Sequence, residues 1–312
     1  MRYMVPGIPS IAAIGLISSI ATMAVAILRA TPAAAQAYFF STGNPDAKMA
    51  TASRPSSAGK IEIESADDFV LTSPTNLNSA TFTGLLPTAA ALSDIVDVRV
   101  EIYRVFPNDS DVGRTSGPPT FSTLQVPTRV NSPSDAAFDE RSASALSLTF
   151  TAGIIQSSFT AANSVLNGIH PAPNFNTGGD GQVTGQEVQF NVSFSTPFSL
   201  PADHYFFVPQ VQLAGADENF FWLSAPKPIV PPGTPFPPGF TDLQEWIRNE
   251  DLAPDWLRVG TDIVGGTTPP TFNATFSLSG QTVPEPAGLT MLALGAAAVF
   301  AAARPKVRPR TP

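Results

Sequence analysis

The chain contains no cysteine and only two histidines, His170 and His204, among its 312 residues. The lack of cysteine excludes disulfides, thiol nucleophiles, iron–sulfur clusters and cysteine-based zinc sites. A zinc site of two or three histidines would need every imidazole of the chain, or more. The sequence also lacks a Gly-x-Ser-x-Gly motif. Because the members of a Ser/His/Asp triad meet in space rather than in sequence, that chemistry is left open but unsupported.

Positive charge is scarce in the central part of the chain. Residues 38–283 contain 24 of the 25 acidic residues but only 11 of the 17 basic ones, a formal net charge of −13. An acidic surface disfavours nucleic acids and anionic lipids as partners. It is compatible with simple solubility, with divalent cations and with neutral polysaccharide. We therefore expect no nucleic-acid partner.

The N-terminal segment has the pattern of a secretory signal peptide. Arg2 precedes an uncharged and mostly apolar run over residues 5–28. Small-residue cleavage sites end at Ala35 and at Ala37, and the second predicts a mature chain that starts at Tyr38. Arg29 lies between the apolar run and these sites, which leaves an uncleaved signal anchor open as an alternative. Both the cleaved signal peptide and the uncleaved anchor imply the secretion translocon as a partner, and the cleaved form also implies signal peptidase. In both cases the body lies outside the inner membrane.

The C-terminal segment combines a short proline–acid–proline motif, an apolar run and a basic tail. The run over residues 289–303 has no charge, and as a helix it would measure roughly 22 Å against about 30 Å for a hydrocarbon core. This predicts a short transmembrane helix that crosses a membrane during export, with the basic tail in the cytoplasm. The alternative, a buried helix of a globular domain, gives the basic tail no role. The motif is Val283, Pro284, Glu285, Pro286 and Ala287, and the tail contains Arg304, Lys306, Arg308 and Arg310.

These three elements in this order resemble the PEP-CTERM sorting signal of bacterial envelope proteins. The resemblance covers about thirty residues of the 312. It implies processing near Pro284–Pro286 by an exosortase, a membrane-embedded transpeptidase. It also implies a protein of a biofilm-forming, exopolysaccharide-producing bacterium, located in the periplasm, on the cell surface or in the extracellular matrix.

The body between the two signals, residues 38–283, has the pattern of short strands joined by turns. In residues 95–105 the side chains Val96, Val98, Val100 and Ile102 alternate with Asp97, Arg99, Glu101 and Tyr103, which predicts a strand with one face in water. Residues 187–195 and 272–278 alternate in the same way. The chain thus divides into residues 1–37, 38–283 and 284–312, with an all-β, antiparallel sandwich or jelly-roll-like body in the middle. Further strands are predicted at 60–64, 68–71, 80–85, 120–126, 146–152, 204–213, 219–223 and 256–264.

A few segments depart from this pattern. Pro209 predicts an edge or bulged strand over residues 204–213. Residues 241–249 predict a two-turn helix, and residues 135–143 a weaker one. The proline-rich segment 225–239 is compatible with a domain linker. A long loop is favoured, because only about 44 residues follow it before the sorting signal, too few for a domain of their own.

Two loops offer oxygen ligands for calcium, the only cofactor that the sequence suggests. Asn176, Asp180 and Glu187 occupy the first, fifth and last positions of a twelve-residue stretch that echoes a calcium loop. Gly178 removes one ligand from it, and the alternative is a glycine-rich turn. Asp109 and Asp111 form a second acidic loop, for which the alternative is a solvated turn after the strand at 95–105.

Other candidate groups have plainer interpretations. The adjacent acids Asp67–Asp68, Asp217–Glu218 and Glu250–Asp251 would point to opposite faces of a strand, so we expect solvated loops rather than the facing pair of a glycosidase. Trp222 and Trp256 lie in apolar strands and are predicted to be core residues. Trp246, on the predicted helix beside the proline-rich segment, is the ring expected to be exposed and to stack on a sugar.

The sequence therefore favours an exported, non-enzymatic surface or matrix protein, delivered by the PEP-CTERM pathway and associated with exopolysaccharide. One alternative is a carbohydrate-active hydrolase on the same scaffold, which needs two inward-facing carboxylates in a cleft lined by tryptophan. The other is a calcium-stabilised adhesive or lectin-like module.

Overall fold

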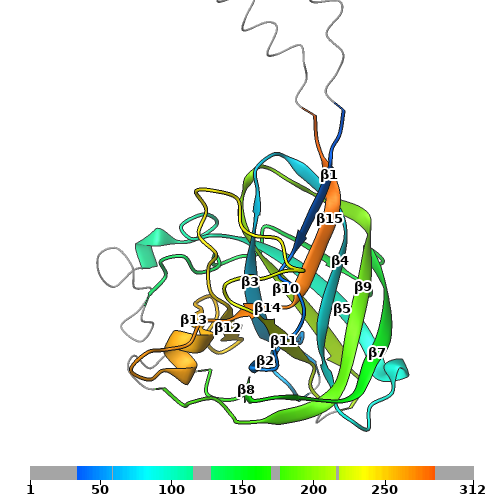
Figure 1. Cartoon of the computed structure of the whole chain (residues 1–312), viewed down its shortest axis with the longest axis vertical. Helices are drawn as coiled ribbons and strands as arrows, with labels where there is room; N and C mark the ends of the chain where they lie inside the picture. Colours follow the sequence, from blue (N-terminus) through cyan, green and yellow to red (C-terminus); the bar gives the residue numbers. More distant parts are fainter. Residues whose placement is uncertain (1–33, 58, 115–127, 170–175, 216–217, 285–312) are drawn as a thin grey trace, which may run out of the picture. The chain divides into compact units, whose positions relative to one another are not determined.

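The computed structural model describes residues 34–57, 59–114, 128–169, 176–215 and 218–284. The chain divides into two units, and almost all of the described residues lie in the one from Gln36 to Thr282. Strands dominate this unit, with only short helical turns between them (Figure 1). The prediction of an all-β body is confirmed.

The first sheet has nine strands within the described ranges. The long strand β4 (Thr75–Leu86) pairs with β9 (Val183–Leu200) along one edge, and along the other with β15 (Phe276–Thr282) and then with β11 (Phe221–Ala225). Strand β7 (Leu148–Ala161) extends the sheet beyond β9. The remaining strands are β1 (Ala37–Ser41), β2 (Met49–Ala52), β8 (Asn163–Val165) and β14 (Asn273–Ala274). Among these pairs only β2 and β8 run parallel in the described structure.

The second sheet has six strands in the described part of the chain, and all of its pairs are antiparallel. In order they are β13 (Leu257–Arg258), β12 (Trp246–Asn249), β3 (Ile63–Leu71), β10 (Asp203–Leu213), β5 (Ile95–Arg104) and β6 (Asp139–Ser142). The helical turns are the 3₁₀ turns η1 (Leu92–Asp94) and η2 (Val112–Arg114), and the π-helical turn η3 (Val259–Val264).

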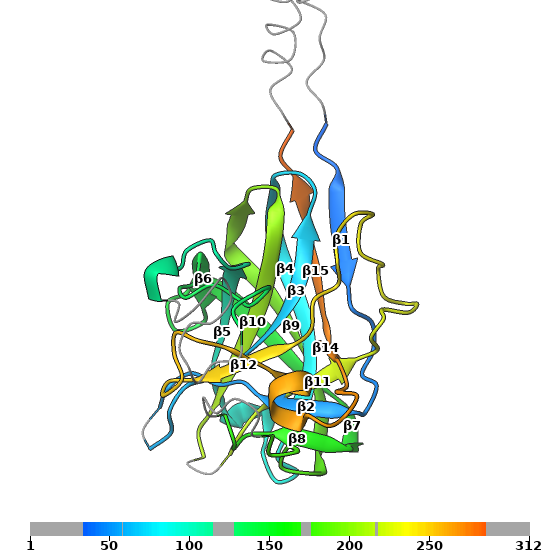
Figure 2. The same ribbon diagram turned by 90° about the vertical axis from the view of Figure 1, so that its left-hand side faces the viewer.

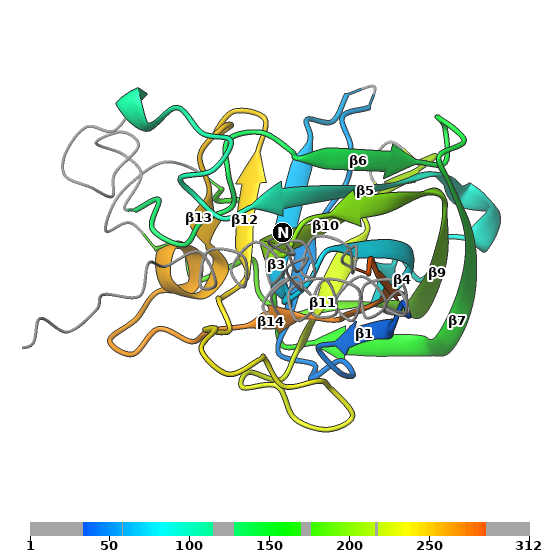
Figure 3. The same ribbon diagram turned by 90° about the horizontal axis from the view of Figure 1, so that it is seen from above.

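The main core is built from side chains of both sheets. Phe82 of β4 stacks on Phe190 of β9 with ring centroids 4.7 Å apart, and Phe207 of β10 stacks on Phe276 of β15 at 5.0 Å. Figure 3 shows β5 and β6 on one side of the molecule and β1 and β14 on the other. A smaller core joins β2, β12 and η3 at the lower end of the view in Figure 2.

The alternating patterns have different outcomes in the two sheets. In β9 the four predicted inward residues Val188, Phe190, Val192 and Phe194 are buried, so this prediction is confirmed. In β5 the prediction that one face lies in water is wrong, because Glu101 and Tyr103 on that face are buried as well. Arg248 of β12 and Trp256 cover them, with the Arg248 Nη2 donating to the Tyr103 hydroxyl at 2.8 Å.

Pro209 does not place its strand at an edge, because β10 lies between β3 and β5. The pairing of β10 with β3 ends at Phe207, so beside Pro209 only β5 continues as a partner strand. The Pro209 carbonyl accepts the Ser53 hydroxyl at 2.5 Å on the side that β3 has left. The backbone nitrogen of Pro209 faces the same side. Because β3 no longer pairs there, the lack of an N–H at Pro209 costs no hydrogen bond between strands.

Three local predictions are wrong because pairing in space overrides a short local pattern. Residues 241–249 form no helix: their second half is β12, which pairs with β3. Residues 135–143 contain β6, which pairs with β5. Of the strand predicted at 256–264, only β13 forms, and the chain then turns into η3. Residues 225–239 leave β11 as a loop inside the same unit, as favoured, with Phe236 packed on Phe40 of β1.

None of the helical turns within the described ranges has the length and hydrophobicity of a membrane span. The predicted signal-peptide run, the short C-terminal transmembrane helix, the strand at 120–126 and His170 lie outside the described residues.

Candidate functional site

Part of the outward face of the first sheet, over β1, β15, β4, β9 and β7, consists of uncharged, mostly hydroxyl-bearing side chains. Because strand side chains alternate, the residues between the buried positions of β1, β15, β4, β9 and β7 all point away from the core. Two rows of paired residues cross these five strands. The first row is Phe39, Ser279, Ser79, Ser193 and Thr149, and the second is Ser41, Ser277, Thr81, Asn191 and Thr151. We call these ten residues the hydroxyl face.

None of the ten residues of the hydroxyl face is charged, although the whole chain carries 42 charged side chains. Nine of them have a hydroxyl or amide group, and these groups both donate and accept hydrogen bonds. The tenth, Phe39, is 58 % exposed. The face is therefore polar and neutral, with one aromatic ring at its edge.

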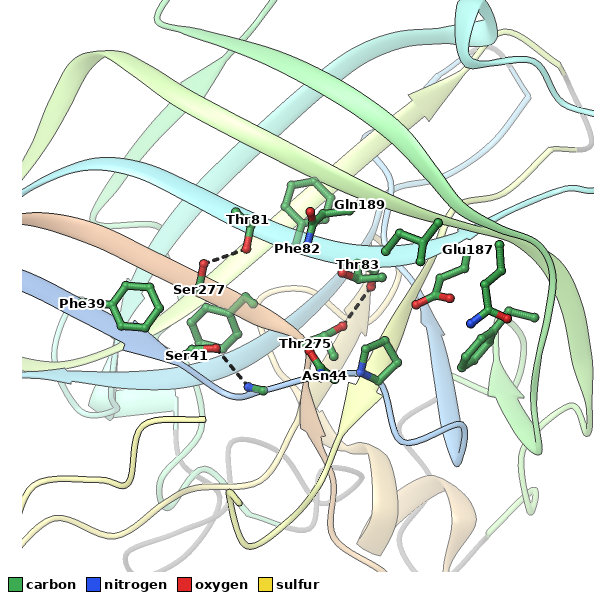
Figure 4. Close-up of a pocket in the computed structure, with 16 residues that line it drawn as sticks. Phe39, Ser41, Asn44, Thr81, Phe82, Thr83, Glu187, Gln189, Thr275 and Ser277 are labelled. Carbon is green, nitrogen blue, oxygen red and sulfur yellow. Dashed lines mark hydrogen bonds between the residues drawn. The ribbon is translucent and has the colours of Figure 1, made fainter. Parts of the chain in front are cut away.

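A groove of about 470 Å³ opens next to the second row. Thr81, Thr83 and Ser277 line it together with residues of β7, β9 and the loop after β1. Figure 4 shows Phe39 and Ser41 at one end of the residues that line the groove and Glu187 at the other end. The Thr81 and Ser277 hydroxyls are 2.7 Å apart, and the Thr275 hydroxyl donates to the Thr83 carbonyl at 3.0 Å.

The shape of the groove depends on irregularities in β7. The register between β7 and β9 shifts twice, between Ile154 and Gln156 and again between Gln156 and Phe159. Such bulges re-aim side chains relative to a regular strand. Ile155, Gln156 and Phe159 line the groove as a result. No alternation in the sequence of β7 indicated these shifts.

Glu187 of β9 is the only carboxyl among the residues lining the groove, all of which are described by the structure. The residue is 4 % exposed, and its Oε2 is buried with no hydrogen-bond partner in the described structure. Burial raises the pKa of this carboxyl above its ordinary value. Buried polar atoms in proteins are normally paired, so an unpaired one in a groove marks a place where a ligand group would be favourable.

The predicted ligands of the first calcium loop have separate partners. The Asn176 amide nitrogen donates to the carbonyls of Thr261 and Asp262, and the Asp180 carboxylate accepts the N–H of Leu166 at 2.6 Å. Glu187 lies in the groove. The segment forms the alternative glycine-rich turn, with positive φ at Gly178, Gly179 and Gly181. Calcium binding at this loop stays a prediction that the observed contacts do not support.

The second acidic loop is occupied by internal partners. Arg104 donates two hydrogen bonds to the Asp109 carboxylate, at 2.6 and 2.7 Å, and this contact lowers the pKa of Asp109. The Asp111 carboxylate accepts the N–H of Gly113 at 2.9 Å. Within the described ranges, no group of three or more histidine, aspartate or glutamate residues is placed to hold a metal ion.

Trp246 is not the exposed ring that the sequence predicted. It lies in β12 rather than on a helix and is 1 % exposed, so it offers no surface on which a sugar could stack. Trp222 and Trp256 are buried, as predicted.

The adjacent acids also differ from the prediction in one place. Asp67 and Asp68 are buried in β3 rather than solvated, and Asp68 Oδ2 is 2.6 Å from His204 Nε2. The pKa of both carboxyls is raised, chiefly by burial. Glu250 and Asp251 do form an exposed turn.

The residues of the predicted processing signals lie at or beyond the ends of the described chain. Ala37 is the first residue of β1, and Ala35 precedes it. Val283 and Pro284 follow β15, whereas Glu285, Pro286, Ala287 and the basic tail lie outside the described residues. Comparisons of the chain with protein-family models, with curated proteins and with solved structures found no match.

Proposed function

We propose that the protein is an exported, non-enzymatic cell-surface or matrix protein whose sandwich-like body associates with extracellular polysaccharide through the hydroxyl face and its groove. The observation that carries this proposal is the absence of charge across all ten residues of that face in an otherwise acidic chain. A neutral polysaccharide presents hydroxyl groups, which hydroxyl and amide side chains match as donors and acceptors.

The size and the composition of the groove support a saccharide ligand. Its volume of about 470 Å³ lies within the range of small-molecule sites. The Phe39 ring, at one end of the groove, is exposed enough for a sugar ring to pack against it. The groove and the Phe39 ring therefore give the otherwise flat hydroxyl face a defined position at which a sugar can bind.

Binding without cleavage is the form of the proposal that the groove favours. Glycoside hydrolysis uses two carboxyl groups that face each other across the scissile bond. Glu187 is a single carboxyl, and the other residues that line the groove have hydroxyl, amide or apolar side chains.

Delivery by an N-terminal signal peptide and a PEP-CTERM signal is the second part of the proposal. The two ends of the body are hydrogen-bonded to each other: the Gln36 N–H donates to Thr282 Oγ1 at 2.9 Å, and the Thr282 N–H donates to the Gln36 carbonyl at 2.8 Å. Cleavage after Ala35 preserves both bonds, whereas cleavage after Ala37 removes them. We therefore expect the mature chain to begin at Gln36 rather than at Tyr38.

Binding is tested by affinity electrophoresis of the purified full-length protein through gels that contain a soluble neutral glucan, mannan or galactan. Thr151→Lys places a charge in the second row of the hydroxyl face and should abolish retardation. The matched control Thr72→Lys makes the same change at an exposed position in the turn between β3 and β4. Retardation by none of the polysaccharides, or equal loss in both variants, would contradict the proposal.

Delivery is tested by mass spectrometry of the protein recovered from a host that possesses an exosortase. We expect an N-terminus at Gln36 and a C-terminus near Pro284. A recovered chain that retains both of its original ends would show that this part of the proposal is wrong.

A further inference from the structure

Glu187 distinguishes one end of the groove from the neighbouring hydroxyl face. Every polar group of that face is neutral, but at this end of the groove a carboxyl group is held between the neighbouring strands. Its partners in the sheet are Leu85 of β4 and Gln156 of β7. Since Leu85 has no polar side-chain atom, it cannot satisfy the carboxyl.

The charge of Glu187 is not compensated from within the groove. None of the residues lining the groove, all described by the structure, is lysine, arginine or histidine. The Oε2 atom is buried and has no hydrogen-bond partner there. Burial is the only cause that raises the pKa of this carboxyl, with no charged neighbour contributing. A buried carboxylate without a partner is costly, so a cationic ligand group would find an unusually favourable position here.

We propose that the groove takes an amino sugar, with its protonated amine paired with the Glu187 carboxylate. This inference rests on the proposed function, since it assumes that the groove binds a saccharide. It specifies which saccharide: one with a free amine at the position that reaches Glu187.

The choice of an amine follows from charge and from hydrogen bonding together. An ammonium group has three donors and a positive charge, so it can donate hydrogen bonds to the Glu187 carboxylate at the groove wall and neutralise its charge at the same time. A hydroxyl or an acetylated amine has one donor and no charge. An anionic sugar would be repelled. The adjacent Gln156, Gln189 and Thr83 are neutral groups that suit the remaining hydroxyls of a sugar ring.

The test compares three disaccharides with the same β-1,4-linked backbone that differ only at carbon 2: hydroxyl in cellobiose, acetamido in diacetylchitobiose and free amine in chitobiose. Their binding to the purified full-length protein is measured by isothermal titration calorimetry. The amine form should bind roughly ten- to a hundredfold more tightly than the hydroxyl form, as expected for a hydrogen bond to a charged group. Glu187→Gln should bring the ratio of the two affinities close to one.

The matched control is Glu250→Gln, which removes the same charge from an exposed turn. It should keep the preference for the amine, because the proposed contact is made by Glu187 alone. A general attraction of the cation to an acidic protein would depend on total charge and would weaken equally in both variants. Glu187→Gln keeps the shape of the side chain, so its thermal unfolding temperature should not fall, and this excludes misfolding as the cause of lost binding.

The outcomes separate this inference from the proposed function. Equal affinity for the amine and hydroxyl forms, or a preference that persists in Glu187→Gln, would overturn the amine inference. If the protein still binds neutral polysaccharide through the hydroxyl face in that case, the proposed function stands. Tighter binding of the acetylated form would assign the groove to a neutral amide and would also overturn the inference.

Discussion

The outward faces of the two sheets use charge in opposite ways. The hydroxyl face of the first sheet is neutral and accessible. On the second sheet, five residues form a buried group that we call the arginine cluster: Glu64, Glu101, Tyr103, Arg248 and Trp256. Arg248 forms an ion pair with Glu64, donates to the Tyr103 hydroxyl and lies 4.3 Å from the centroid of the Trp256 ring. The Tyr103 hydroxyl lies 2.7 Å from Glu64 Oε1 and 3.0 Å from Glu101 Oε2.

This difference shows that a polar strand face can serve stability or remain available for a ligand. In the arginine cluster each charged group has a partner, and the partners come from β3, β5 and β12, which the cluster ties together. On the hydroxyl face few side chains bond to one another, the Thr81–Ser277 pair being an example of those that do. We therefore expect substitutions in the cluster to change stability, and substitutions on the face to change binding.

The largest effect is expected from Arg248→Met. This change leaves the buried carboxyl of Glu64 without its cation, and loss of one partner of a buried ion pair costs about 3–5 kcal/mol. Urea unfolding should show this decrease in the free energy of unfolding. The control Arg104→Met breaks the more exposed pair with Asp109 and should cost only about 1 kcal/mol or less. Similar losses in both variants would contradict the contrast between cluster and surface.

A smaller effect concerns pH and the carboxyl of Glu245, which is buried next to β12. Burial raises its pKa from the ordinary 4.5 to about 8. Between these two values the folded state holds a proton that the unfolded state has lost, so stability falls as pH rises from about 4.5 to about 8. Glu245→Gln should remove the share of this slope that Glu245 contributes, on the order of 3 kcal/mol, whereas the other buried carboxyls with raised pKa, such as Asp67 and Asp68, keep theirs. Thermal unfolding at pH 5 and pH 8 measures it.

The exposed Glu250→Gln is the control for the pH experiment. It should leave the difference between pH 5 and pH 8 as in the unaltered protein. An unchanged pH dependence in Glu245→Gln would show that Glu245 is not the group responsible.

The smallest effect on stability is expected from Thr151→Lys on the hydroxyl face. An exposed substitution away from buried contacts usually changes the free energy of unfolding by about 0.5 kcal/mol or less. The variant that should lose polysaccharide retardation should therefore unfold at nearly the same urea concentration as the unaltered protein. A loss of more than about 1 kcal/mol would mean that the hydroxyl face also supports the fold, and the comparison between the two faces would fail.

The strand pattern of β9 could be predicted from the sequence because it has one buried and one exposed face. Val188 and Phe190 are inward and Gln189 is half-buried on the other side, as alternation requires. In β5 the same rule failed at Glu101 and Tyr103. Their polar character suggested water, but Arg248 arrives from a segment more than a hundred residues away and covers them. No local pattern contains that information.

The candidate site was missed for a related reason. The spacing of Glu187 from Asn176 in the sequence predicts Glu187 as the last ligand of a calcium loop. The structure instead places Glu187 against Gln156 of β7 and near Thr83 of β4, in a groove built from five strands. Of these strands, β9 and β15 show an ordinary alternation of small polar and apolar residues at the groove. A single unpaired carboxyl among them becomes noticeable only when the strands lie side by side.

The sequence by itself determined the all-β class, the inward residues of β9 and the location of the two candidate processing signals, because each depends on neighbours within a few residues. Only the tertiary structure decided which polar side chains are buried and which five strands share a face. Burial and pairing depend on residues that meet from distant parts of the chain. Both the arginine cluster and the groove at Glu187 are formed by residues from distant parts of the chain. In the cluster Arg248 is paired with Glu64, whereas in the groove the Oε2 atom of Glu187 has no hydrogen-bond partner within the described structure.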